Sequence, residues 1–210
     1  TQEAELPMSD CAVSSPASLF EKLRPAVARS LSRERWEHTS GVISRAERLA
    51  TRHGLDPWKA RLAALLHDGA RELPMPEMLR LEAEFGIITD KIERSCAELL
   101  HAPVGAGLAM TVHRIEDPEI VNSIRYHTTG RPRMSPLEKL IYVADYTAPD
   151  RDFEGARLAA EAADADLDRG LLLAVGGTIN YLVAERRVIH PRSLETWNWI
   201  VGNSTCGARN

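Results

Sequence analysis

The chain has 210 residues, of which 44% are hydrophobic and 27% are charged, and its 26 Lys and Arg against 30 Asp and Glu give a formal net charge of -4. This composition is typical of a soluble globular protein and excludes a disordered chain. The slight acidic excess argues against a nucleic-acid partner bound through a broad basic face. The three cysteines form no CxxC pair, and the chain has neither a signal-peptide pattern nor an apolar run of about 20 residues, so we expect a cytoplasmic protein with no membrane partner.

Four helix starts are marked by a capping residue followed by proline, at Ser15-Pro16, Asp56-Pro57, Asp117-Pro118 and Ser135-Pro136. The capping side chain accepts a hydrogen bond from a backbone N–H of the first turn, and proline at the first helical position loses no hydrogen bond. Apolar residues follow these starts at helical spacing, and no segment alternates convincingly with a period of two. The chain is therefore expected to be all-α.

Helical periodicity also predicts helices over about residues 32–53, 90–100, 104–113 and 166–187. The last of these carries an apolar stripe from Leu167 to Leu182, which we assign to the core, with a homodimer face as the second interpretation. No linker rich in Pro, Gly or Ser divides the chain. We expect a single helical domain over residues 18–202, a flexible N-terminal tail over 1–17 and a frayed C-terminal tail over 203–210.

Residues able to bind a metal fall at inward-facing positions of several predicted helices. His38 lies four residues before Val42 on one apolar face, and Asp145 lies four residues after Ile141 on another. The other candidates are His67-Asp68, His101 and His127. Any one of these histidines alone is better explained as a core or capping residue. The occurrence of all six residues on one all-α chain indicates a shared site.

The side chains in this set offer imidazole nitrogen and carboxylate oxygen without thiolate, which suits iron, manganese, zinc or magnesium. Gaps of 29 residues from His38 to His67 and 77 from Asp68 to Asp145 exclude a local zinc finger, so tertiary packing must assemble the site. An inward carboxylate such as that of Asp145 is unfavourable without a cation. Either a metal ion or an arginine would meet this requirement.

Five segments resemble the HD-domain metal-dependent phosphohydrolases, and among these the bacterial YqeK-type symmetrical diadenosine tetraphosphate hydrolases. The segments are 35–39 (RWEHT), 64–68 (ALLHD), 100–106 (LHAPVGA), 124–132 (IRYHTTGRP) and 137–145 (LEKLIYVAD). The His-Asp pair alone is a weak signal, whereas LHAPVGA followed by YHTTGRP is specific. The resemblance extends from about Ser18 to Ile200, with mild departures at Gly69 and Arg71.

The resemblance implies a single HD-domain helical bundle that splits diadenosine tetraphosphate (Ap4A) into two ADP with a metal-activated water. The implied cofactor is a divalent metal, iron first, with manganese, cobalt, magnesium or zinc as alternatives. The implied primary ligands are His38, His67, Asp68 and Asp145. His101 and His127 correspond to positions that hold a second metal or contact substrate phosphate. Asp68, His101, His127 and Asp145 form the implied catalytic set.

A polyphosphate substrate also requires fixed cations beyond the metal, because it carries several negative charges. Arg35 lies one helical turn before His38, and Arg151 follows the turn beyond Asp145, so both are candidates for binding substrate, together with His101, His127 and Thr128. The alternative for Arg35 and Arg151 is a surface position in contact with solvent. For Arg131 and Arg133 this alternative is favoured over substrate binding. We assign the four tryptophans to core packing rather than to adenine stacking.

Two other functions remain open from the sequence. One is an HD-superfamily nucleotidase or phosphodiesterase that acts on mononucleotides or cyclic nucleotides. The other is a catalytically silent HD scaffold that binds a nucleotide or a partner protein. Silent scaffolds are expected to lack ligands, whereas all six candidate residues are present here.

Overall fold

The computed structural model describes residues 15–206, with side chains described up to residue 203. Within that range the chain forms ten α-helices and one 3-10 helix and no β-strand, which confirms the all-α prediction. The helices are α1 (Pro16–Ser30), α2 (Arg33–Arg52), α3 (Pro57–Leu66), α4 (Met75–Glu84), η1 (Glu93–Ser95), α5 (Ala97–Thr111), α6 (Pro118–Arg125), α7 (Pro136–Tyr146), α8 (Glu154–Ala165), α9 (Leu167–Ala184) and α10 (Pro191–Cys206).

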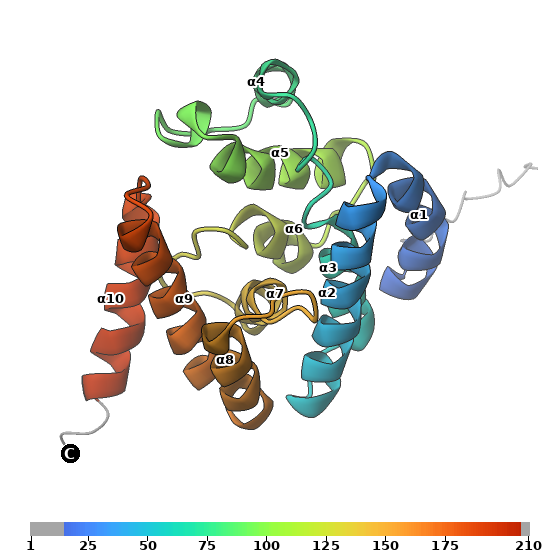
Figure 1. Cartoon of the computed structure of the whole chain (residues 1–210). Helices are drawn as coiled ribbons and strands as arrows, with labels where there is room; N and C mark the ends of the chain where they lie inside the picture. The colour runs from blue at the N-terminus through green and yellow to red at the C-terminus, as the bar shows by residue number, and fades with distance from the viewer. Residues whose placement is uncertain (1–14, 207–210) are drawn as a thin grey trace, which may run out of the picture.

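Helix α7 lies near the centre of the bundle and packs against α2, α3, α6 and α9 (Figure 1). Helix α5 packs on α6 and is covered by α4, while α8 and α10 both pack on α9. The main apolar core includes Leu62, Ile124 and Ile141, which are fully buried between these central helices. A smaller cluster around Met78 and Leu100 joins α4 to α5. Helices α2, α3, α5, α6 and α7 thus form a rigid frame around one interior region.

Each helix start predicted from a capping residue and proline is confirmed. The capping side chain accepts a hydrogen bond from a backbone N–H of the first turn at Ser15, Asp56, Asp117 and Ser135. These caps satisfy N–H groups that have no partner within the helix. Each cap depends only on residues of the same helical turn, so the sequence alone is enough to predict it.

The structure differs from the prediction around Pro103, where two helices were expected. Helix α5 runs unbroken from Ala97 to Thr111, with Pro103 in its interior. Proline removes one helical hydrogen bond, but residues on both sides of it are buried against α4 and α6. Tertiary packing therefore outweighs the local helix-breaking tendency. Helices α4, α8 and α10 were not predicted.

The division into a domain over residues 18–202 and two tails stays a prediction, because residues 1–14 and 207–210 lie outside the described range. Helix α1 begins at Pro16, and α10 ends at Cys206. Between residues 15 and 206, none of the helices combines the length and apolar character that crossing a bilayer requires.

Candidate metal centre

Five helices bring the six predicted residues to a common point in the interior. They are His38 on α2, His67 and Asp68 directly after α3, His101 on α5, His127 after α6 and Asp145 in the last turn of α7. All except Asp145 are buried, and the Asp145 side chain is 22% exposed. The convergence that the spacing predicted is therefore present, with one carboxylate open to solvent.

The backbone fixes the tautomers of two of these histidines. His67 Nδ1 donates to the carbonyl of Ala64 and His127 Nδ1 donates to that of Ile124, both at 2.7 Å. Because a carbonyl oxygen only accepts, each ring carries a proton on Nδ1. In the neutral ring the lone pair is then on Nε2. The Nε2 atoms of His67 and His127 lie 3.4 Å and 3.8 Å from carboxylate oxygens of Asp68.

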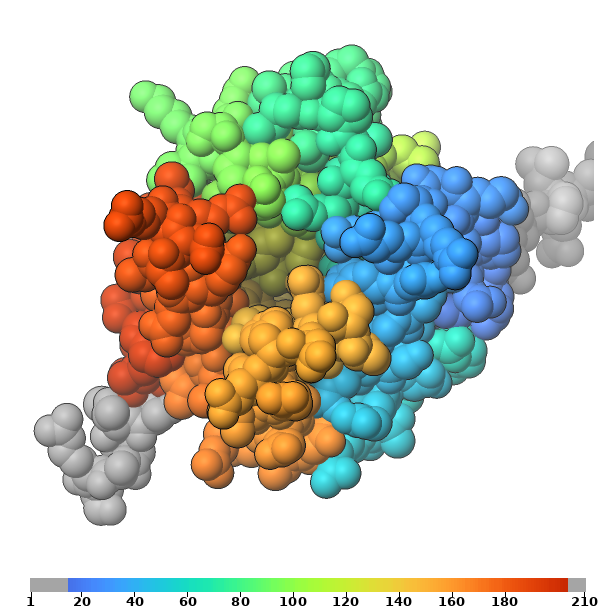
Figure 2. Space-filling model, viewed as in Figure 1, coloured from blue at the N-terminus to red at the C-terminus, as the bar shows by residue number. Residues whose placement is uncertain are grey.

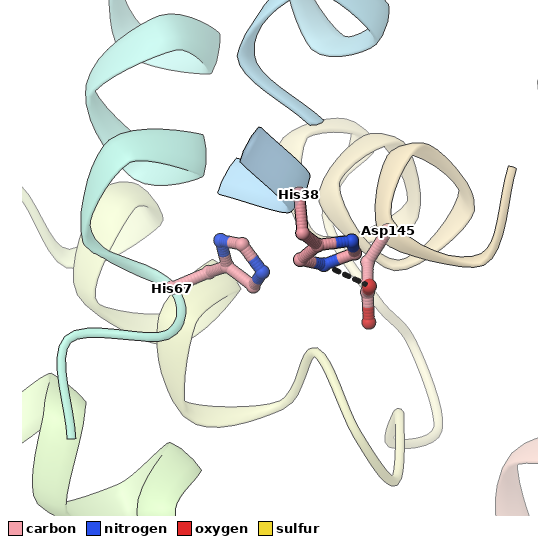
Figure 3. A group of neighbouring side chains, drawn as sticks. All are labelled: His38, His67 and Asp145. Carbon is pink, nitrogen blue, oxygen red and sulfur yellow. Dashed lines mark ion pairs between the residues drawn. The ribbon is translucent and has the colours of Figure 1, made fainter. Parts of the chain in front are cut away.

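His38 is oriented by Asp150, a residue in an exposed turn that the sequence analysis missed. The two carboxylate oxygens of Asp150 lie 3.1 Å and 2.9 Å from His38 Nδ1, so this nitrogen carries the donated proton. His38 Nε2 then faces Asp145 Oδ1 at 3.1 Å (Figure 3). The turn comes this close because Gly41 has no side chain: a Cβ there would lie 2.9 Å from Pro149 Cδ.

When these rings are neutral, the Nε2 lone pairs of His38 and His67 face carboxylate oxygens, and either a proton or a metal ion must lie between them. The buried Nε2 atoms of His38 and His67 make no hydrogen bond among the described residues. One ligand atom each from His38, His67 and Asp145 lie within 4.8 Å of one another, and so do those of His67, Asp68 and His127. Two acceptors about 3 Å apart repel unless a cation compensates them. The donor set thus fits a divalent metal held by nitrogen and oxygen.

The electrostatics of the centre also favour a bound positive charge. Burial lowers the pKa of His67, but the carboxylates of Asp68 and Asp145 raise it more, to about 9. Burial raises the pKa of Asp68, but His67 and His101 lower it more, so that it lies well below its usual range. Burial and the neighbouring imidazoles lower the pKa of His127 to about 3, so this ring stays neutral with its lone pair available.

A polar pocket of about 180 Å³ opens over the centre. It corresponds to the hollow in Figure 2, bordered by α2, by the segment after α7 and by the segment that leads to α5. All five residues predicted to bind substrate line it: Arg35, His101, His127, Thr128 and Arg151. Arg71 and Glu98 line it as well and were missed, because neither belongs to a ligand motif. Substrate contact by these residues stays a prediction.

Two arginines reach from the pocket wall to carboxylates of the centre. Arg35 Nη1 lies 3.0 Å from Asp68 Oδ2, and Arg151 Nη2 lies 3.1 Å from Asp145 Oδ1. Asp145 therefore has an arginine partner and also lies among the possible metal ligands, so the two kinds of cation can both contact it. Arg131 lies elsewhere and pairs with Glu138 at 2.6 Å.

Three of the four tryptophans pack against the core as predicted, whereas Trp58 is 37% exposed. Trp36, Trp197 and Trp199 are partly buried against the main core, and Trp58 packs edge-on against Phe20 with ring centroids 6.1 Å apart. No tryptophan is among the residues that line the polar pocket over the metal centre.

Comparison with known proteins agrees with this geometry. Residues 35–150 match the family described as HD domain. A structure from Clostridium acetobutylicum, described as a predicted HD superfamily hydrolase involved in NAD metabolism, superposes with a TM-score of 0.83 at 35% identity over 88% of this chain and 97% of that one. The chain thus belongs to the HD-domain hydrolases.

Two curated relatives narrow the family further. The symmetrical bis(5'-nucleosyl)-tetraphosphatase of Bacillus subtilis is 38% identical over 88% of this chain and 98% of its own length. The protein of the same name from Halalkalibacterium halodurans is also 38% identical, over 81% of this chain and 91% of its own. Within the HD-domain hydrolases, the chain belongs to the symmetrical bis(5'-nucleosyl)-tetraphosphatases. The resemblance identified from the sequence motifs is confirmed.

Proposed function

We propose that the protein hydrolyses Ap4A symmetrically, with water, into two molecules of ADP. The observation that carries this proposal is the set of inward-facing imidazole Nε2 atoms of His38, His67 and His127 against the carboxylates of Asp68 and Asp145. That set lies beneath a pocket with arginine side chains on its wall. A cation and fixed positive charge are what polyphosphate hydrolysis requires, because catalysis of phosphoryl transfer is mostly positioning and charge neutralisation. The names of the relatives support the choice of substrate.

In this proposal, the divalent metal is held by His38, His67, Asp68 and Asp145. Iron is our first choice, because it is the metal that the family resemblance implies, with manganese, cobalt, magnesium or zinc as alternatives. When bound, such a metal supplies positive charge near the transferring phosphorus and lowers the pKa of a coordinated water toward about 7.

His101 and His127 form a second part of the proposed centre. Their Nε2 atoms lie 3.0 Å apart, and His101 Nε2 lies 3.2 Å from Asp68 Oδ1. Since the His127 ring is neutral, its Nε2 can accept a hydrogen bond. A proton on His101 Nε2 can therefore be donated either to His127 Nε2 or to Asp68 Oδ1. With its proton on Nδ1, toward the carbonyl of Ala97, His101 offers a lone pair to a second metal, and with the proton on Nε2 it can donate to a phosphate oxygen.

Three further pocket residues are assigned to the substrate phosphates. Arg35 and Arg151 offer guanidinium groups that match phosphate oxygens in pairs, and Thr128 offers a hydroxyl. Asp145, the most exposed of the six centre residues, is the group we propose to orient the attacking water. Water attacks one of the two central phosphorus atoms and the central P–O–P bridge breaks. One ADP leaves with the bridging oxygen, and the other ADP retains the attacked phosphorus and gains the water oxygen.

Product analysis tests this proposal directly. Purified protein supplied with iron, manganese or cobalt is incubated with Ap4A, and the products are resolved by ion-exchange chromatography. We expect ADP as the sole nucleotide product. AMP plus ATP, or no turnover with any of these metals, contradicts the proposal. Parallel assays with mononucleotides and cyclic dinucleotides test the nucleotidase and phosphodiesterase alternatives.

We also propose that the enzyme acts in the cytoplasm and that its partner is the small-molecule substrate or ADP, with a homodimer as a further possibility. In the structure the stripe on α9 mostly faces the main core, to which Leu171 and Val175 belong. Sedimentation analysis of the purified protein measures the oligomeric state.

A further inference from the structure

A second and larger cavity, of about 850 Å³, adjoins the polar pocket over the metal centre. The two share six lining residues and so form one continuous space: Arg71, Glu98, His127, Thr128, Asp145 and Arg151. The larger cavity extends from the centre to α9, where Tyr181 and Leu182 line it. Its volume lies within the range of about 300–1,000 Å³ that small-molecule sites occupy. None of the residues that line only this larger cavity has a role in the proposed chemistry.

The wall remote from the metal centre is aromatic and partly exposed. Tyr146, Phe153 and Tyr181 all line it. The Tyr146 and Phe153 rings pack edge to face, with centroids 5.4 Å apart and planes at 87°. Even so, Phe153 is 44% exposed and Tyr181 is 55% exposed. Large aromatic side chains left accessible within a concave site offer flat apolar surfaces to a ligand ring.

Two glycines let these aromatic residues take their positions. Gly155 and Gly177 both line the cavity, and the Tyr146 hydroxyl occupies the space that a Cβ at Gly177 would need. At Gly155 a Cβ would lie 3.1 Å from the same hydroxyl and 3.5 Å from Phe153 Cε2. A larger residue on α9 at position 177 would displace Tyr146 and, with it, the support of Phe153. The aromatic wall is thus fixed by close packing between α7, α8 and α9.

The chemistry of the cavity changes along its length. Arg151 and Thr128 lie at the end shared with the metal centre, where phosphate charge is compensated. Glu98 and Arg187 pair across the lining at 3.0 Å and contribute no net charge. The aromatic residues lie beyond the shared end. A ligand that is anionic at one end and carries a flat ring at the other matches this order.

We infer that the larger cavity binds the nucleoside of one nucleotide half of the substrate, with Phe153 and Tyr181 contacting the base. This inference rests on the proposed function for the placement of the phosphates. It adds to that function by separating the residues that recognise the nucleoside from those that act on phosphate. Base stacking on aromatic side chains tolerates different bases, so we expect affinity for nucleoside diphosphates in general.

The test compares two ligands on the metal-loaded protein: ADP and inorganic pyrophosphate. Isothermal titration calorimetry measures Kd for both with the wild type, Phe153→Leu, Tyr181→Leu and the double variant. Leucine keeps apolar volume but removes the ring. Val183→Ala is the matched control, since Val183 is 61% exposed on the same helix as Tyr181 and does not line the cavity.

We expect wild-type protein to bind ADP more tightly than pyrophosphate. Each single variant weakens ADP binding by about five- to tenfold and leaves pyrophosphate binding unchanged, as expected from the loss of one stacking contact. Equal wild-type affinity for the two ligands overturns the inference. So does an unchanged ADP affinity in the double variant, or an equal loss for both ligands.

These outcomes are separate from those of the product analysis. If the variants bind ADP more weakly but bind pyrophosphate normally, the nucleoside site is supported even when Ap4A gives AMP and ATP. If Ap4A yields ADP but the variants bind ADP normally, symmetric hydrolysis stands and the nucleoside site is rejected.

Discussion

Two clusters of histidine and carboxylate occur in the described part of the chain, and they differ in how their donor atoms are used. The central cluster contains His38, His67 and Asp145, and a peripheral cluster contains Asp90, Glu93 and His190. In both, the ligand atoms lie within 4.8 Å of one another. By proximity alone, either cluster fits a metal ion.

In the peripheral cluster the potential ligand atoms already have partners. The backbone N–H of Arg192 donates to His190 Nδ1, and His190 Nε2 donates to Asp90 at 2.7 Å. Glu93 accepts from the Arg192 guanidinium and from the backbone N–H of Asp90. This cluster therefore connects the segment before α5 to the start of α10.

In the central cluster the Nε2 atoms of His38 and His67 are buried without a hydrogen bond to any described residue. Buried polar atoms without partners are rare in proteins, and they indicate a missing ligand or ion. The comparison teaches that unsatisfied lone pairs distinguish a metal centre from a structural connection better than proximity does.

The largest expected effect comes from removing a central carboxylate. Asp68→Ala should abolish metal content and lower turnover by more than about a hundredfold, beyond the range typical of a residue that only supports a ligand. Glu93→Gln, in the peripheral cluster, should keep full metal content. Elemental analysis and Ap4A turnover measure both variants. An Asp68→Ala protein with full metal would show that the centre is misplaced.

An intermediate effect is expected at Asp150, which holds the proton of His38 Nδ1. Asp150→Asn leaves the metal ligands unchanged but weakens this orientation, so metal affinity should fall by about 10- to 100-fold. Titration against a competing chelator measures the affinity without relying on activity. Asp152→Asn is the control, because Asp152 is exposed and, among the described residues, pairs only with Arg157. Equal affinity in the two variants would contradict an orienting role for Asp150.

The smallest effect is expected in the peripheral cluster and concerns stability. Burial raises the pKa of Asp90, but hydrogen bonds from the Glu93 backbone and from His190 lower it more, so the net pKa is lowered. A lowered pKa stabilises the fold above the unfolded value of about 3.9, and this stabilisation is lost as pH falls further. Since Asp90 is exposed, the contribution should stay below about 1 kcal/mol.

Urea unfolding of Asp90→Asn from pH 7 to pH 3 measures this contribution. The experiment is made in the Asp68→Ala background, where acid release of metal plays no part. The free energy of unfolding should fall less steeply below about pH 4 than in Asp68→Ala alone. A steeper fall would assign the acid response to another group.

The sequence predicted much of the fold and of the metal centre because the relevant signals are local or periodic. Asp56 and Ser135 act as caps through neighbours in the same turn. His38 and Asp145 were placed on inward faces from the apolar residues four positions away, and the structure brings them within 3.1 Å. The family motifs then joined these positions into one ligand set.

Other features depend on contacts between distant segments and carry no such signal. Asp150 lies in an exposed turn, and its role follows only from where α2 meets that turn. Phe153 and Tyr181 would be counted as ordinary surface aromatics without the cavity between α7 and α9. The helix break expected near Pro103 was wrong. Helix α5 is held together by burial on several sides, and this tertiary packing cannot be predicted from the helix propensity of the residues near Pro103.

Gly41 has a consequence for efforts to make this protein more robust. Replacing a mid-helix glycine by alanine is a standard route to higher thermal stability, with a gain of about 1 kcal/mol. On α2 the added methyl group would press on Pro149 and move the turn that carries Asp150. The same change would therefore make the helix more stable and the enzyme weaker in metal retention. At this position, stability and activity are opposed.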